Sequence, residues 1–90
     1  MSFQWDERKA KANLKKHGVS FEEAKSVFRD VKVRLVPDRE HSDDEERFLA
    51  LGMGHQSRIL VVAHCYRGNA IRVFSARKAD MAEVKRYYGG

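Results

Sequence analysis

The sequence predicts an α+β domain: a short N-terminal strand, two helices, a four-stranded antiparallel sheet and a C-terminal helix. Two segments with helix-capping residues fill residues 6–29. Four runs rich in β-branched and aromatic residues follow over residues 31–76, and a helical pattern returns near the C-terminus. Helices followed by strands with short connections are typical of the α+β class.

The first helix follows a short extended segment, Phe3–Trp5. Asp6 can cap this helix, which we expect to extend to about His17, and Gly18 is a natural stop. Its apolar side is weak, so we expect it at the rim of the fold; the apolar residues are Ala10 and Leu14. Beside them, four polar residues share one stripe at helical spacing: Lys9, Asn13, Lys16 and His17.

The second helix opens at Ser20, which has capping-box spacing to Glu23. Its apolar residues recur at helical spacing and should be buried; they are Phe21, Ala24, Val27 and Phe28. The two helices therefore form a predicted αα-hairpin with a tight connection.

The sheet is predicted from four runs: Val31–Val36, Arg47–Met53, Arg58–Tyr66 and Ala70–Ala76. The first alternates apolar and basic residues, which indicates a half-exposed strand that ends at Pro37. The third is the most hydrophobic and should be central. Residues 67–69 form a strong hairpin turn, and along the last strand Ile71 and Val73 should face the core while Arg72 faces away.

The last predicted helix extends from about Ala79 to Tyr88. Met81, Val84 and Tyr88 form its expected inner stripe. Tyr87 lies off that stripe, where its hydroxyl could serve the end of the sheet or its ring could cover the core edge.

The length of 90 residues predicts a single domain covering residues 1–90. The apolar fraction of 42% is typical of a folded chain. A lone cysteine, Cys65, cannot form an internal disulfide, which favours a reducing cytoplasm. No apolar run approaches the roughly 20 residues of a membrane helix, so no membrane partner is expected.

The positive charge is unevenly distributed. Residues 37–46 contain one Lys or Arg and six Asp or Glu, whereas the rest of the chain contains seventeen basic and seven acidic residues. A basic surplus of this kind suits nucleic acid or another polyanion, although a soluble basic surface without a partner is the simpler alternative.

Several kinds of catalytic site are not indicated by the sequence. The four histidines show no metal-binding spacing, so no metal and no cofactor are expected. The carboxylates at residues 43–46 suggest a solvated loop, and His64, in the hydrophobic strand, suggests a core histidine.

The remaining candidates are cations in or beside strands: Arg47, Arg72, Arg77 and Lys78. For Arg47 and Arg72, pairing with Glu45, Glu46 or Glu83 is as plausible as a functional role.

Four blocks of the sequence resemble the BrnT family of toxins. They are residues 3–6, residues 13–24 (NLKKHGVSFEEA), residues 45–52, and residues 71–79 (IRVFSARKA). The blocks cover nearly the whole chain in the family's order and spacing. The one departure noted is Phe74, which begins a motif that in the family reads I-S-A-R-K-A.

The resemblance implies a RelE/ParE-like ribonuclease, the toxin of a type II toxin–antitoxin pair, which cleaves RNA without metal and stalls translation. It also implies a BrnA-type antitoxin, whose ribbon-helix-helix part would bring the complex to operator DNA.

Residue roles follow from the resemblance together with the chemistry of phosphate cleavage. Arg72 and Arg77 would bind the phosphate, supported by Lys16 and Arg47, because arginine is always charged and holds phosphate bidentately. His17 or Tyr87 would carry the proton, although capping of the first helix also explains His17. Further RNA contacts would come from Lys9, Asn13 and Lys78.

Two other readings stay open: a non-catalytic module that binds nucleic acid or an antitoxin, and a basic domain that contacts another protein. The acidic loop, residues 38–46, is a poor surface for RNA. We therefore expect it away from the RNA cleft or on the antitoxin side.

Overall fold

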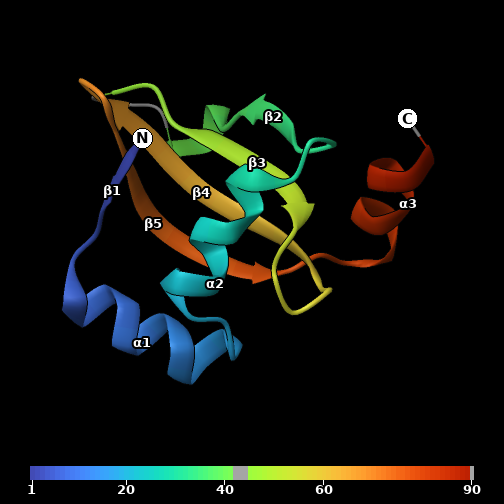
Figure 1. Ribbon diagram of the computed structural model, residues 1–90, viewed down its shortest axis with the longest axis horizontal. Helices are drawn as coiled ribbons and strands as arrows, with labels where there is room; N and C mark the ends of the chain where they lie inside the picture. Colours follow the sequence, from blue (N-terminus) through green and yellow to red (C-terminus); the bar gives the residue numbers. More distant parts are fainter. Residues whose placement is uncertain (42–44, 90) are drawn as a thin grey trace.

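The computed structural model describes residues 1–41 and 45–89, which form three helices, two 3₁₀ turns and one sheet (Figure 1). The helices are α1 (Glu7–His17), α2 (Phe21–Ser26) and α3 (Met81–Gly89), and the 3₁₀ turns are η1 (Val27–Arg29) and η2 (Arg39–His41). The strands are β1 (Ser2–Gln4), β2 (Arg34–Pro37), β3 (Phe48–Met53), β4 (Ile59–Arg67) and β5 (Ala70–Lys78). The α+β class is confirmed.

The sheet has five strands in the order β1-β5-β4-β3-β2. The four predicted strands are antiparallel neighbours as expected, but the prediction of a sheet of four strands is wrong, because the N-terminal strand belongs to the same sheet. The N-terminal strand joins the sheet in parallel with β5, pairing Ser2 with Ala70 and Gln4 with Arg72. The other neighbours are antiparallel. Three residues are too few to reveal a partner by their pattern, and this partner lies almost seventy residues away.

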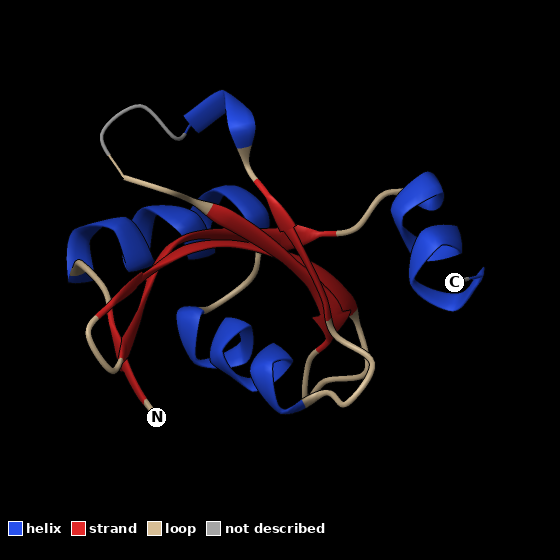
Figure 2. Ribbon diagram, turned by 90° about the horizontal axis from the view of Figure 1, so that it is seen from above, coloured by secondary structure: helices blue, strands red, loops and turns tan. Residues whose placement is uncertain are grey.

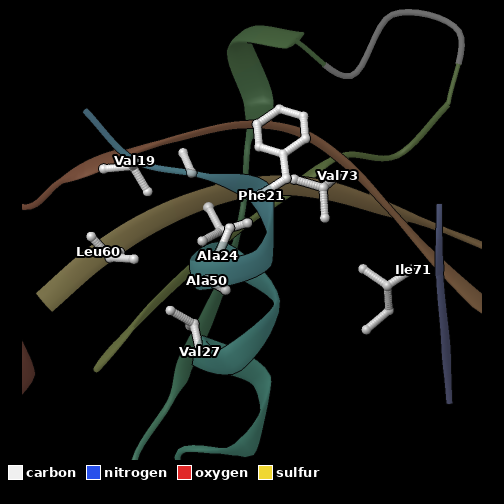
Figure 3. Close-up of a cluster of buried hydrophobic side chains, with 10 residues drawn as sticks. Val19, Phe21, Ala24, Val27, Ala50, Leu60, Ile71 and Val73 are labelled. Carbon is white, nitrogen blue, oxygen red and sulfur yellow. The ribbon is translucent and has the colours of Figure 1, made fainter. Parts of the chain in front are cut away.

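One face of the sheet, which we call the α2 face, carries the main core. Figure 2 shows α2 on one side of the arched sheet and η2 on the other. Figure 3 shows buried side chains of α2 and its flanks packed against strand residues. The ten buried residues of this cluster are Val19, Phe21, Ala24, Val27, Ala50, Leu60, Val62, Ile71, Val73 and Ala76. Ile71 and Val73 therefore face the core as predicted.

The opposite face, which we call the cleft face, carries a smaller cluster. Leu51, Val61 and Tyr87 are buried there. Tyr87 is 6% exposed, whereas Met81 is 78% and Tyr88 65% exposed, so the predicted inner stripe of the last helix is wrong. The sequence spacing could not show it, because the polar contacts of Glu83 and Tyr87 hold α3 in place.

Two strand boundaries differ from prediction by more than one residue. Val31 is 97% exposed and lies in a turn in which the Lys32 backbone N–H donates to the Asp30 carboxylate, so β2 begins only at Arg34. At the other end of the sheet, β5 extends through Lys78 instead of ending at Ala76.

The helix caps follow the sequence closely. The Asp6 carboxylate accepts from the backbone N–H of Arg8, and the Ser20 hydroxyl accepts from that of Glu23. Gly18 ends α1 with a φ of 69°, a left-handed conformation that favours glycine. None of the helices in the described part of the chain has the length and apolarity to cross a membrane.

Candidate functional site

A cleft of about 420 Å³ opens on the cleft face of the sheet. Its walls come from α1, the η2 segment, the start of β3, and β4 and β5. The lining residues are Lys9, Asp38, Glu40, His41, Arg47, Leu49, Val61, Ala63, Phe74, Ser75 and Arg77. Three cations from three separate segments, Lys9, Arg47 and Arg77, are thus brought to one concave surface.

A β-bulge in β5 produces this arrangement. Ala63 of β4 pairs with Ser75 and His64 pairs with Val73, so Phe74 has no partner in β4. One extra residue reverses the alternation of a strand. Val73 faces the α2 core before the bulge, and Ala76 faces it afterwards. As a result Arg77 lies on the same face as Arg72, although strict alternation would place them on opposite faces.

Phe74 lies beneath two of the cations. The guanidinium carbon of Arg47 is 4.0 Å from the Phe74 ring centroid, and the ammonium nitrogen of Lys9 is 5.7 Å from it. Both distances are in the range of cation–π attraction. The sequence analysis did not select Phe74; its place between Arg72 and Arg77 was the available signal.

Arg77 is held by a carboxylate of α3. Its two terminal nitrogens donate to the two oxygens of Glu83, at 2.8 and 2.9 Å. This pairing raises the pKa of Arg77 and lowers the pKa of Glu83. The sequence suggested Glu83 as a partner for Arg47 or Arg72, but the structure pairs it with Arg77. The side chain of Arg77 is still 42% exposed in the cleft.

A second, shallower pocket of about 220 Å³ adjoins the cleft and shares Lys9, Phe74 and Ser75 with it. Its other lining residues include Lys16 and His17 from the last turn of α1. The two predicted residues are therefore next to the cleft, at the edge of the sheet formed by β5.

Asn13 also lies at this edge, but its side chain has a structural role. It is 7% exposed, and its amide nitrogen donates to the backbone oxygens of Val19 and Ala76. Its amide oxygen accepts from the backbone N–H of Ala76 at 3.1 Å. Because both polar groups are used inside the protein, the geometry disagrees with the predicted contact to substrate.

Arg72 and Lys78 lie outside the cleft lining. Arg72 pairs with Cys65 and is on the cleft face, half-buried, nearer the hairpin end of β5. Among the residues that the structure describes, its guanidinium forms no hydrogen bond or ion pair. Lys78 is exposed at the last position of β5.

The hydroxyl of Tyr87 forms its hydrogen bond outside the cleft. Its hydroxyl donates to the Asp30 carboxylate at 2.5 Å, and this bond with burial raises the pKa of Tyr87 to about 12. The Asp30 carboxylate also accepts from the backbone N–H of Met53. Tyr87 is absent from the lining of the cleft, so the geometry disagrees with a role as proton carrier.

The described part of the acidic loop borders the cleft. Asp38, Glu40 and His41 line it beside Arg47, so the described part of the loop does not lie away from this cleft. The alternative, that the loop lies on the antitoxin side, stays a prediction. Asp43 and Asp44 are outside the described residues. Nδ1 of His41 is 3.0 Å from the Asp38 carboxylate. Sequence analysis missed His41, for which the only signal was an Asp three residues earlier.

Metal-ligand chemistry has no cluster to support it in the described ranges, where no three His, Cys, Asp or Glu side chains converge. The cleft instead offers cations, an aromatic ring and a histidine next to a carboxylate. Cations can bind phosphate, the ring can contact a base, and imidazole can exchange a proton near neutral pH.

Comparisons with known proteins agree with this chemistry. The family model described as "Ribonuclease toxin, BrnT, of type II toxin-antitoxin system" matches residues 5–83. The crystal structure of the Brucella abortus ribonuclease toxin BrnT matches with a TM-score of 0.70 and 27% sequence identity, covering 90% of this chain and 99% of that one. A search of curated proteins gave no significant match. The chain belongs to the BrnT family of ribonuclease toxins of type II toxin–antitoxin systems.

Proposed function

We propose that this chain is a metal-independent endoribonuclease that inhibits translation in the cytoplasm by cutting RNA bound in the cleft. The observation that supports the proposal best is the convergence of Lys9, Arg47 and Arg77 on one concave surface. Family membership supplies the class of reaction, and the cations of the chain can supply the charge stabilisation that a metal would otherwise provide.

The reaction follows from the chemistry of RNA. The 2′-oxygen attacks the adjacent phosphorus as a base removes its proton, and the bond from phosphorus to the 5′-oxygen breaks as an acid protonates that oxygen. The products are a 2′,3′-cyclic phosphate and a 5′-hydroxyl end. Negative charge on the phosphoryl oxygens grows during attack, and Arg47 and Arg77, which line the cleft, would stabilise it.

Two histidines are candidates for proton transfer. His17 lies in the pocket beside Phe74, with Lys16 as its neighbour. His41 lines the cleft itself, and Asp38 binds its Nδ1, which leaves Nε2 for the substrate. Arg72 is proposed to guide the RNA along the cleft face outside the reacting centre. Lys78, which is exposed at the end of β5, is proposed to contact the RNA beyond the cleft.

Cleavage of RNA by the purified protein in EDTA tests the activity. We expect cleavage to continue in EDTA and to fall by at least about 100-fold in Arg47→Ala, as for other lost transition-state contacts. Lys85→Ala, which removes an exposed cation of α3 that does not line the cleft, is the control. Parent activity in a folded Arg47→Ala variant, or loss of activity in EDTA, would contradict the proposal.

The proton carriers are separated by His17→Ala and His41→Ala. The variant that lacks the carrier should lose about 100-fold or more in kcat and the corresponding limb of its pH profile. Unchanged profiles in both variants would remove both histidines from the mechanism.

We also propose a BrnA-type antitoxin as the partner, through which the toxin would reach operator DNA. Family membership implies an antitoxin, and the cleft-face cations offer it a basic surface. Expression of the chain alone should arrest growth, and the product of an adjacent gene should relieve the arrest and co-purify with the chain. Arrest that no adjacent gene product relieves would count against this partner.

A further inference from the structure

The bulge in β5 presents an aromatic ring inside a cleft otherwise lined mainly by polar and charged groups. Phe74 is the bulged residue and Ser75 follows it, and both line the cleft. A half-exposed phenylalanine at this position loses the benefit of full burial. Bulges often redirect side chains next to binding sites. The ring is therefore only partly buried, and the side chains of Arg47 and Lys9 lie over it.

Arg47 lies against this ring. With its guanidinium carbon 4.0 Å from the ring centroid, the planar group contacts the ring face, and the cation–π attraction restricts its movement. The hydrogen bond from Arg67 is the main cause of the lowered pKa of Glu45, and Arg47 makes only a small contribution. Arg47 thus both contacts the ring of Phe74 and lines the cleft.

A guanidinium plane and an aromatic ring are the two surfaces on which single-stranded RNA bases stack. A phosphate alone would require only the cations. An acidic peptide would also use the cations, but it would gain little from a π surface. The combination of a stacked Arg–Phe pair with neighbouring cations fits a base together with its phosphate.

We propose that Arg47 and Phe74 form a nucleobase-stacking site that holds the base next to the cleaved phosphate. This inference rests on the proposed ribonuclease function. Phe74 keeps the guanidinium in place, and the base stacks on the Arg47–Phe74 pair. Lys9, 5.7 Å from the ring centroid, lies close enough to bind the phosphate of that nucleotide.

Two conservative variants test the stacking. Phe74→Leu keeps an apolar side chain and removes the π surface, whereas Arg47→Lys keeps the charge and removes the plane. Each should raise the KM for RNA cleavage by about 5- to 100-fold, the range expected for one stacked base, and Phe74→Leu should change kcat much less. Lys85→Ala, at an exposed position of α3 outside the cleft, should retain the KM of the parent. Thermal melting establishes that the variants fold.

A direct readout uses Phe74→Trp in a Trp5→Phe background, in which position 74 holds the sole tryptophan. A single-stranded oligonucleotide should quench its fluorescence, whereas polyphosphate or an oligonucleotide that is abasic along its length should bind without quenching. Anisotropy of a labelled oligonucleotide measures binding independently of quenching.

The outcomes separate the two proposals. If the parent does not cleave RNA but the oligonucleotide quenches the fluorescence of the Phe74→Trp variant, the enzymatic proposal fails and the stacking site stands. If the parent cleaves RNA while Phe74→Leu and Arg47→Lys keep its KM, the stacking site is overturned and the enzyme stands. Loss of antitoxin binding by these variants with unchanged KM would also overturn it.

Discussion

Asn13 shows how one buried amide fixes the edge of the sheet beside the cleft. β1 covers only the first part of β5, so the backbone at Ala76 has no neighbouring strand on that side. The Asn13 side chain replaces the missing strand by pairing with both the N–H and the oxygen of Ala76. Sequence spacing placed Asn13 on a polar stripe and could not show this long-range contact.

Asn13→Ala should therefore lower the free energy of unfolding by about 2–4 kcal/mol, because buried backbone groups of Ala76 and Val19 would lose partners. Urea denaturation measures the change. Lys15→Ala, an exposed position on the same helix, should change stability by less than about 0.5 kcal/mol. A loss below about 1 kcal/mol in Asn13→Ala would mean that water replaces the amide without cost.

His64 was predicted as a core histidine, and the structure confirms this at 0% exposure. Its ring contacts Phe28, Phe48 and Tyr66, and burial lowers its pKa below the usual 6.5. Below pH 6.5 the unfolded chain binds a proton that the folded chain resists. The stability due to the neutral ring is present above pH 6.5 and is lost as pH falls below that value.

The wild-type protein should lose stability relative to His64→Gln as pH falls from about 7 to about 5, by up to about 1.4 kcal/mol per pH unit. Denaturant unfolding at several pH values measures the difference. The carboxylates with lowered pKa values, such as Asp30 and Glu83, affect stability at lower pH and should contribute equally to both proteins. Parallel pH profiles would contradict the assigned shift.

At the scale of elements, α3 is attached to the rest of the fold by few contacts. Two of them are polar: Tyr87 to Asp30 and Glu83 to Arg77. The Glu83 carboxylate also accepts from the backbone N–H of Asp80, so the same group caps the helix and holds Arg77. The pattern of Met81, Val84 and Tyr88 predicted the wrong face, because these polar contacts decide the orientation of α3.

Tyr87→Phe distinguishes a structural tyrosine from a catalytic one. Loss of the hydroxyl should cost about 1 kcal/mol of stability, since Asp30 keeps its backbone donors. It should leave kcat for RNA cleavage within about twofold of the parent. A fall in kcat of about 100-fold or more, typical of a lost acid or base, would show that Tyr87 takes part in proton transfer.

The sequence predicted those features of the elements that local chemistry determines. The caps at Asp6 and Ser20, the Gly18 stop and the hairpin at Gly68 are all present. The bulge at Phe74 was not predicted. The residues of β5 alone do not show that β4 has no residue to pair with Phe74. The site was consequently predicted with its cations but without Phe74 and His41.

At the scale of the molecule, the charge pattern brings acids next to cations. Asp38 and Glu40 border the cleft that Lys9 and Arg47 line, so RNA entering it meets both signs of charge. The net charge of +5 therefore overstates the positive charge that RNA would encounter in the cleft. This proximity was not visible in a sequence where the acidic segment reads as a separate loop.

Salt should weaken RNA binding only moderately. With about three cations on phosphates, the slope of log affinity against log salt should be about −2, because each single-strand phosphate contact contributes about −0.7. Lys9→Met should reduce the slope by about 0.7 and Lys85→Met should not change it. Fluorescence anisotropy between about 50 and 300 mM salt provides the measurement. A slope near zero in the parent would remove phosphate contacts as the source of affinity.

The parallel pairing of β1 with β5 constrains how the chain can fold during synthesis. Residues 2–4 leave the ribosome long before their partners, residues 70–72. The sheet is therefore completed only after β5 has emerged, since pairings between distant segments form late. Because Arg77 follows these partners in β5, the cleft is complete only after that point of synthesis. An antitoxin that binds released chains would then act early enough to protect the cell.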